Sequence, residues 1–211
     1  MKRHKFALLL ACLFLLVWFF HSPIADKLTQ DEINHYLNAI QEFPFPPEEK
    51  AEILDRIRAW ALADDGKPVF MLNLMRYYDQ IQPGAPEFHG TAEEQNKYFT
   101  KKVLPILFKR LEYPMVLAYT QGKNLVGIDP AIDNWSEVVL VRYPNRKAFL
   151  RLLADPTYQQ IIPYKLTAVK LYLTPLSGKI LIPDMRWIVG GVLLTVFLAV
   201  GWIKAARRNK K

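Results

Sequence analysis

Cysteine, histidine and glycine are scarce in this chain, and each scarcity excludes a class of chemistry. The single cysteine, Cys12, rules out an intramolecular disulfide and a multi-cysteine metal site. Only two histidines, His35 and His89, lie well inside the sequence, too far apart to form a ligand set. The glycines build no phosphate-binding loop, and no motif for nucleophilic catalysis is present. The sequence therefore predicts no metal and no cofactor.

Excess positive charge is missing from the centre of the chain. The sequence has 28 Lys and Arg against 20 Asp and Glu, a net charge of +8. Residues 1–5 supply three of these charges and residues 204–211 supply five, so the remaining sequence is balanced. Basic tails that stand beside apolar runs indicate membrane orientation and not binding to nucleic acid.

Each basic tail adjoins an apolar run. The run from Trp187 to Ile203, WIVGGVLLTVFLAVGWI, contains no charged residue and is long enough for a helix that spans a bilayer. It predicts a transmembrane helix over residues 185–204, followed by a basic cytoplasmic tail over 205–211.

The first run, from Phe6 to Phe20, predicts an N-terminal membrane anchor within residues 1–25. An uncleaved anchor is favoured over a cleaved signal peptide, because the run ends in the bulky residues Trp18, Phe19 and Phe20. Basic residues accumulate on the cytoplasmic side of spanning helices. The sequence therefore predicts an integral protein of a bacterial inner or plasma membrane, with both termini cytoplasmic, the central domain extracytoplasmic and the lipid bilayer as a partner.

A helical hairpin is predicted over residues 26–66. The stretch TQDE forms a capping box, with Thr29 as the N-cap and Glu32 three residues later, and apolar residues follow at helical spacing. FPFPP ends this helix, and a second helix is predicted from about Pro47 to Ala63.

From residue 67 to about 180 the pattern becomes that of an α+β domain. VFMLNLMRY, PMVLAYTQG, SEVVLVRY and LTAVKLYLTPL have the composition of strands. One helix is predicted between the first two strands, and another is predicted from Asn145 to just before Pro156. The order β-α-β-β-α-β predicts a ferredoxin-like domain, which the hairpin precedes and two transmembrane helices flank.

The central domain resembles the DUF1330 family of the dimeric α/β-barrel superfamily. The resemblance is carried by an asparagine in the first strand (Asn73), by Arg-Tyr-Pro after the third strand, and by Asp-Pro-x-Tyr ending at Tyr158. It implies a homodimer in which the sheet face away from the helices lines a cavity that the second subunit closes. The sequence departs from the family in its membrane segments, its hairpin, and the stretch TQGKNLVG where a glycine-rich turn is usual.

Four residues are candidates for binding a small-molecule ligand: Asn73, Tyr98, Arg142 and Tyr158. An arginine can hold a carboxylate with two hydrogen bonds, and an asparagine can orient a carbonyl group. A purely structural interpretation is also open, in which Arg142 pairs with Asp155 and Asn73 satisfies strand backbone.

Three functions fit these observations. The first is a membrane-anchored extracytoplasmic domain that binds a small molecule or a partner. The second is a cofactor-free oxygenase or isomerase that acts on a small apolar or aromatic acid. The third is a structural subunit of an envelope complex.

Overall fold

The computed structural model describes residues 26–84, 87–122, 125–127, 129, 133–177 and 185–208, together with Leu8 and Cys12. The chain divides into two compact units, Met1–Ser177 and Gly178–Lys211, which we describe separately. The first unit contains an α+β fold around a four-stranded antiparallel sheet.

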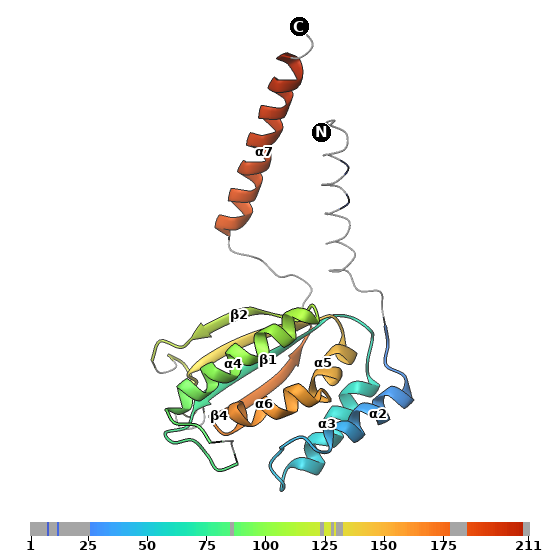
Figure 1. The fold of residues 1–211 in the computed structure, drawn as a ribbon, viewed down its shortest axis with the longest axis vertical. Helices are drawn as coiled ribbons and strands as arrows, with labels where there is room; N and C mark the ends of the chain where they lie inside the picture. Colours follow the sequence, from blue (N-terminus) through green and yellow to red (C-terminus); the bar gives the residue numbers. More distant parts are fainter. Residues whose placement is uncertain are drawn as a thin grey trace. The chain divides into compact units, whose positions relative to one another are not determined.

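The sheet consists of β1 (Val69–Tyr77), β2 (Tyr113–Tyr119), β3 (Glu137–Tyr143) and β4 (Val169–Leu176). The strand order is β2-β3-β1-β4, so β1 and β3 are central and β2 and β4 are the edges (Figure 1). The register pairs Asn73 with Val139 on β3 and with Leu173 on β4. Because directly paired residues of adjacent strands share a face, the register fixes which side chains lie together.

Three helices cover one face of this sheet: α4 (Ala92–Lys109), α5 (Arg146–Leu153) and α6 (Pro156–Leu166) (Figure 1). A capping box starts α4, in which Thr91 accepts a hydrogen bond from the Glu94 amide and Glu94 accepts one from Thr91. Asn145 caps α5, as the sequence predicted. The helix α6 was not predicted.

The dipeptide Asp155-Pro156 explains why α6 was missed. Proline disfavours helical geometry in the residue before it, so α5 ends at Leu153. The same proline is well suited to the first turn of a helix, and the Asp155 carboxylate accepts hydrogen bonds from the Thr157 and Tyr158 amides. One dipeptide therefore ends α5 and begins α6.

A helical hairpin precedes the sheet and packs beside α5. It consists of α2 (Gln30–Ile40), which begins with the capping box at Thr29, and α3 (Lys50–Leu62). The hairpin shares the main hydrophobic core with the sheet and its helices, since its buried residues belong to the same cluster as those of α5. The hairpin residues of this cluster are Ile33, Leu37, Ile40, Phe43 and Ala61.

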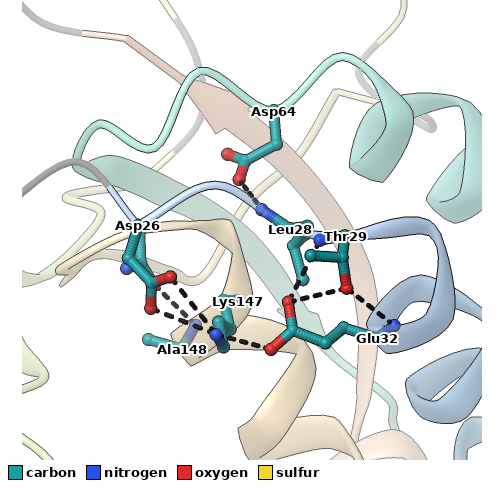
Figure 2. A network of polar contacts seen from close by, with 8 residues as sticks. Asp26, Leu28, Thr29, Glu32, Asp64, Lys147 and Ala148 are labelled. Carbon is teal, nitrogen blue, oxygen red and sulfur yellow. Dashed lines mark hydrogen bonds and ion pairs between the residues drawn. The ribbon is translucent and has the colours of Figure 1, made fainter.

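Polar contacts reinforce this packing, and Figure 2 shows them around Lys147 of α5. Lys147 Nζ lies 2.6 Å from a Glu32 carboxylate oxygen and 3.1 Å from one of Asp26. Asp64, which follows α3, accepts a hydrogen bond of 2.8 Å from the Leu28 amide. Partly exposed pairs contribute about 1 kcal/mol or less, so these contacts orient the hairpin more than they stabilise it.

The two faces of the sheet differ in what lies on them. The covered face carries Met71, Asn73 and Met75 of β1, and Met71 belongs to the same buried cluster as Phe99 and Val103 of α4. The open face carries the alternate residues of β1, such as Leu72 and Leu74, which are only partly buried.

The second unit contains the helix α7 (Met185–Arg208). In the part of the chain that the structure describes, no helix combines the length and apolar character needed to cross a membrane. The helix does not stop at Ile203 but continues through Lys204 to Arg207 and Arg208, so it includes the basic residues that were assigned to a separate tail.

This finding corrects three predictions. A fold flanked by two transmembrane helices, a transmembrane helix over 185–204, and an integral membrane location with cytoplasmic termini and an extracytoplasmic centre are wrong. The predicted anchor over residues 1–25 lies outside the described residues, apart from Leu8 and Cys12.

Candidate functional site

A cleft of about 1440 Å³ is lined by residues of the sheet, of α4 and α6, and of the hairpin. Covered-face residues of β1 and β4 line it, including Met71, Asn73 and Leu173, and so does Phe99 of α4. It extends to the hairpin, where Trp60 is one of its lining residues. Its lining is mostly apolar, and Asn73, Asn96 and Lys165 are among its polar residues, a composition that is usual for a small-ligand site.

The first polar group of the cleft is the amine of Lys165 on α6. Its Nζ donates a hydrogen bond of 2.7 Å to Asn73 Oδ1, and it lies 5.6 Å from the centre of the Phe99 ring. The residue is only 9% exposed. Burial lowers the pKa of Lys165 to about 8, because the charged ammonium loses its hydration, while the negative charge of Glu137 acts in the opposite direction.

Asn73 is held in place by two backbone carbonyls, one on its own strand β1 and one on the neighbouring strand β3. Its Nδ2 donates hydrogen bonds to the Met71 carbonyl at 3.1 Å and the Val139 carbonyl at 3.4 Å. These two bonds turn Oδ1 toward Lys165, so the asparagine acts as a fixed acceptor for the amine.

The cleft-lining residue Asn96 also contacts the carboxylate of Glu137, at the start of β3. Glu137 Oε2 accepts hydrogen bonds from Tyr77 at 2.6 Å and from Asn96 Nδ2 at 2.9 Å. Burial is the main cause that raises the pKa of Tyr77, and the hydrogen bond to Glu137 adds to it, so the phenol stays protonated and remains a donor.

Two buried amide oxygens beside this group have no hydrogen-bond partner among the described residues. They are Asn96 Oδ1 and Gln95 Oε1. Gln95 Nε2 donates hydrogen bonds of 2.8 Å to the Tyr164 carbonyl and to the Thr167 hydroxyl. Of the two residues, Asn96 lines the cleft and Gln95 does not.

A separate buried acid lies near the start of β2. Glu112 is 1% exposed, and its Oε2 has no hydrogen-bond partner among the described residues. Burial raises the pKa of this carboxyl to about 8, against the opposing charges of Arg110 and Arg151. Glu112 does not line the cleft.

Two of the four predicted site residues lie in the cleft. Asn73 is one of its polar groups, and Tyr158 lines it from the start of α6. Tyr158 is buried against Phe43 and Phe99, each with ring centres 6.2 Å away, and this burial raises the pKa of its phenol.

The other two predicted residues lie elsewhere. Arg142 pairs with Phe70 of β1, so it lies on the open face, with its guanidinium 5.6 Å from the centre of the Tyr113 ring. Tyr98 is on the outer side of α4, 36% exposed, beside Phe88 and Tyr164. The structure therefore does not bring all four residues into one pocket, and their role in binding stays a prediction.

Sequence reasoning missed Lys165, Glu137 and Asn96. Lys165 follows Tyr158 and Ile162 at the spacing of one helical stripe, but this signal appears only once α6 is recognised as a helix. Glu137 alternates with Val139 on β3 and so shares the covered face.

The comparisons with known proteins show a fold and no family. No family model matches the chain, and no curated protein matches it. A methylated form of the protein RPA0582 is similar in structure, with a TM-score of 0.51 and 24% identity over 63% of this chain and 93% of that one. This similarity shows a shared fold.

Two further solved structures are more weakly similar. RPA0582 itself, a protein of unknown function from Rhodopseudomonas palustris, has 25% identity over 63% of this chain and 94% of its own, with a TM-score of 0.49. A hydroxynitrile lyase from Passiflora edulis has 13% identity over 56% of this chain and 98% of its own, with a TM-score of 0.36. At these TM-scores neither similarity bears on function.

Proposed function

We propose that the α+β domain binds a small, largely apolar molecule that carries a carboxylate or carbonyl group, in the cleft that residues of the sheet, the helices and the hairpin line. The observation that supports this most is that the cleft is lined both by a residue with a buried donor and by a residue with a buried acceptor that has no hydrogen-bond partner among the described residues. Lys165 Nζ and Asn96 Oδ1 both belong to residues that line a cleft whose other residues are mainly apolar.

The polar groups define the chemistry of the ligand. Lys165 offers charge-assisted hydrogen bonds to a carboxylate or carbonyl oxygen, and Asn73 keeps the amine in place. Asn96 offers an acceptor for a hydroxyl or amide proton of the ligand. The apolar residues Phe99, Met71 and Leu173 provide contact for a ring or an alkyl chain.

The test is calorimetric titration of the full chain with benzoate at pH 7, as a probe that combines an apolar ring with a carboxylate. We expect saturable binding that Lys165→Met weakens about tenfold or more, the loss expected for one charge-assisted contact. Lys97→Met, which removes an exposed amine of α4, is the matched control and should leave the affinity unchanged. Loss of binding in an Arg142→Lys variant, and not in Lys165→Met, would place the site on the open face, and no binding by the parent chain would contradict the proposal.

We also propose that the open face pairs with the same face of a second copy, as the resemblance to the DUF1330 family implies. The central rows of this face are apolar: Leu74 pairs with Val138 and Tyr172, and Leu72 pairs with Leu140. Tyr172 is 54% exposed, which is unusual for a large apolar ring on a flat sheet. Arg142 lies toward one end of this face and Arg76 with Lys170 toward the other, but its central rows are apolar, and rows of this kind can pack against their own copy in a symmetric pair.

A further inference from the structure

The amine of Lys165 differs from those of Lys97 and Lys147 in its surroundings. Its partner is the neutral amide of Asn73, and no carboxylate of the described residues forms an ion pair with it. By contrast, Lys147 contacts Asp26 and Glu32, and Lys97 lies 2.6 Å from Glu93. An ammonium held by a carboxylate is poorly reactive, since a lysine attacks carbon only as the neutral amine.

Burial makes the neutral amine available at Lys165. Because the pKa of Lys165 is lowered to about 8, its fraction of neutral amine at pH 7 is roughly 300-fold larger than that of a lysine with the ordinary pKa of 10.5. The groups that face it are Asn73 and Glu137 from the sheet and the Phe99 ring from α4. Glu137 carries the one negative charge among them, and Tyr77 and Asn96 hold it by hydrogen bonds.

We propose that Lys165 is an imine-forming residue that condenses with the carbonyl carbon of a small apolar aldehyde or ketone bound in the cleft. This inference rests on the proposed ligand-binding function and names the reactive class of ligand. The geometry supports it, because Lys165 lines the cleft and its Nζ lies between two other lining residues, 2.7 Å from Asn73 Oδ1 and 5.6 Å from the centre of the Phe99 ring.

The reaction balances without an oxidant, a reductant or a co-reactant. The lone pair of Nζ attacks the carbonyl carbon, and the C=O π bond breaks to give a carbinolamine. The carbon–oxygen bond then breaks, a C=N bond forms, and the oxygen leaves as water with the two hydrogens of the neutral amine. Uptake of one proton gives an iminium ion, whose positive charge the Glu137 carboxylate stabilises.

The experiment uses the full chain, benzaldehyde and cyanoborohydride at pH 7. Cyanoborohydride reduces an imine to a stable secondary amine, which peptide mass spectrometry assigns to a residue. We expect Lys165 to be labelled at least about tenfold more than Lys97, whose pKa the Glu93 carboxylate raises and which serves as the internal control. Even labelling of the two lysines would overturn the inference.

Two variants complete the test. Lys165→Met should fold, because it replaces a buried amine by an apolar side chain of similar length, and it should lose the selective label. Lys97→Met should keep the label at Lys165. If benzoate binds but Lys165 is not labelled selectively, the imine inference fails while the proposed function stands. If the parent chain shows neither binding nor selective labelling, both fail.

Discussion

The two faces of the same sheet differ in chemistry although their residues alternate along the same strands. The covered face carries Asn73, which accepts a hydrogen bond from Lys165, and Glu137, which accepts one from Tyr77. The open face places Leu72, Leu74 and their partners in apolar rows. The comparison teaches that polarity alone does not mark the outer face of this sheet, because Asn73 and Glu137 are buried on the face that the helices cover.

The largest effect is expected on the open face. In Leu74→Arg a charge enters the centre of the apolar rows, and a pair of subunits would have to bury it without a partner. We expect the chain to sediment with the mass of one subunit, whereas the parent sediments with the mass of two.

Leu62→Arg is the matched control for this change, because Leu62 is 55% exposed on α3, away from the sheet. It should leave the mass unchanged. A parent chain that sediments as one subunit in analytical ultracentrifugation would show that the open face does not pair.

A smaller effect, of about 3 to 5 kcal/mol, is expected from the buried acid Glu112. An unfolded glutamate releases its proton near pH 4.5, whereas folded Glu112 releases it near pH 8. Between these values the folded state holds a proton that the unfolded state has lost, so the free energy of unfolding falls as the pH rises from about 4.5 to about 8.

Glu112→Gln should remove this contribution, which urea denaturation at pH 5 and pH 8 can measure. We expect the variant to be more stable than the parent at pH 8 and similar to it at pH 5. Glu52→Gln, an exposed site on α3, should keep the pH dependence of the parent. The same slope in Glu112→Gln as in the parent would mean that the Glu112 carboxyl is not protonated in the folded state.

The smallest expected effect is a difference in the free energy of unfolding between truncations of two adjacent residues of β1 that lie on opposite faces. Met71 is 3% exposed on the covered face, so Met71→Ala should lower the free energy of unfolding by about 2 to 5 kcal/mol. Leu72 is only partly buried on the open face, and Leu72→Ala should cost about 1 kcal/mol in an isolated subunit. Urea unfolding at two protein concentrations measures both, and equal losses at low concentration would mean that the two faces are equally buried.

The sequence predicted the local elements better than the site. Thr29, Thr91 and Asn145 cap helices through contacts with residues a few positions away, so a short sequence window contains the signal. The four strands follow from runs of apolar residues for the same reason. Apolar composition also indicated membrane-spanning helices, and there it misled, because none of the helices in the described part of the chain is both long and apolar enough to cross a membrane.

The site depends on residues distant in sequence, and this is why it was harder to predict. Lys165 and Asn73 are separated by 92 positions. Which face of β1 the helices cover is decided by packing and not by alternation, so Asn73 and Arg142 were assigned together although they lie on opposite faces. Strand alternation gives two sets of side chains, and only tertiary structure says which set is inside.

Under the proposed function, the hairpin has a consequence for the evolution of ligand preference. Trp60 and Phe43 of the hairpin line the cleft. Asp26 and Glu32 contact Lys147 of α5, and Asp64 accepts a hydrogen bond from the Leu28 amide within the hairpin segment. A change in the length or the bulk of residues 43–60 would resize one wall without altering a strand. Selectivity can therefore drift through the hairpin while the amine and its amide acceptor stay the same.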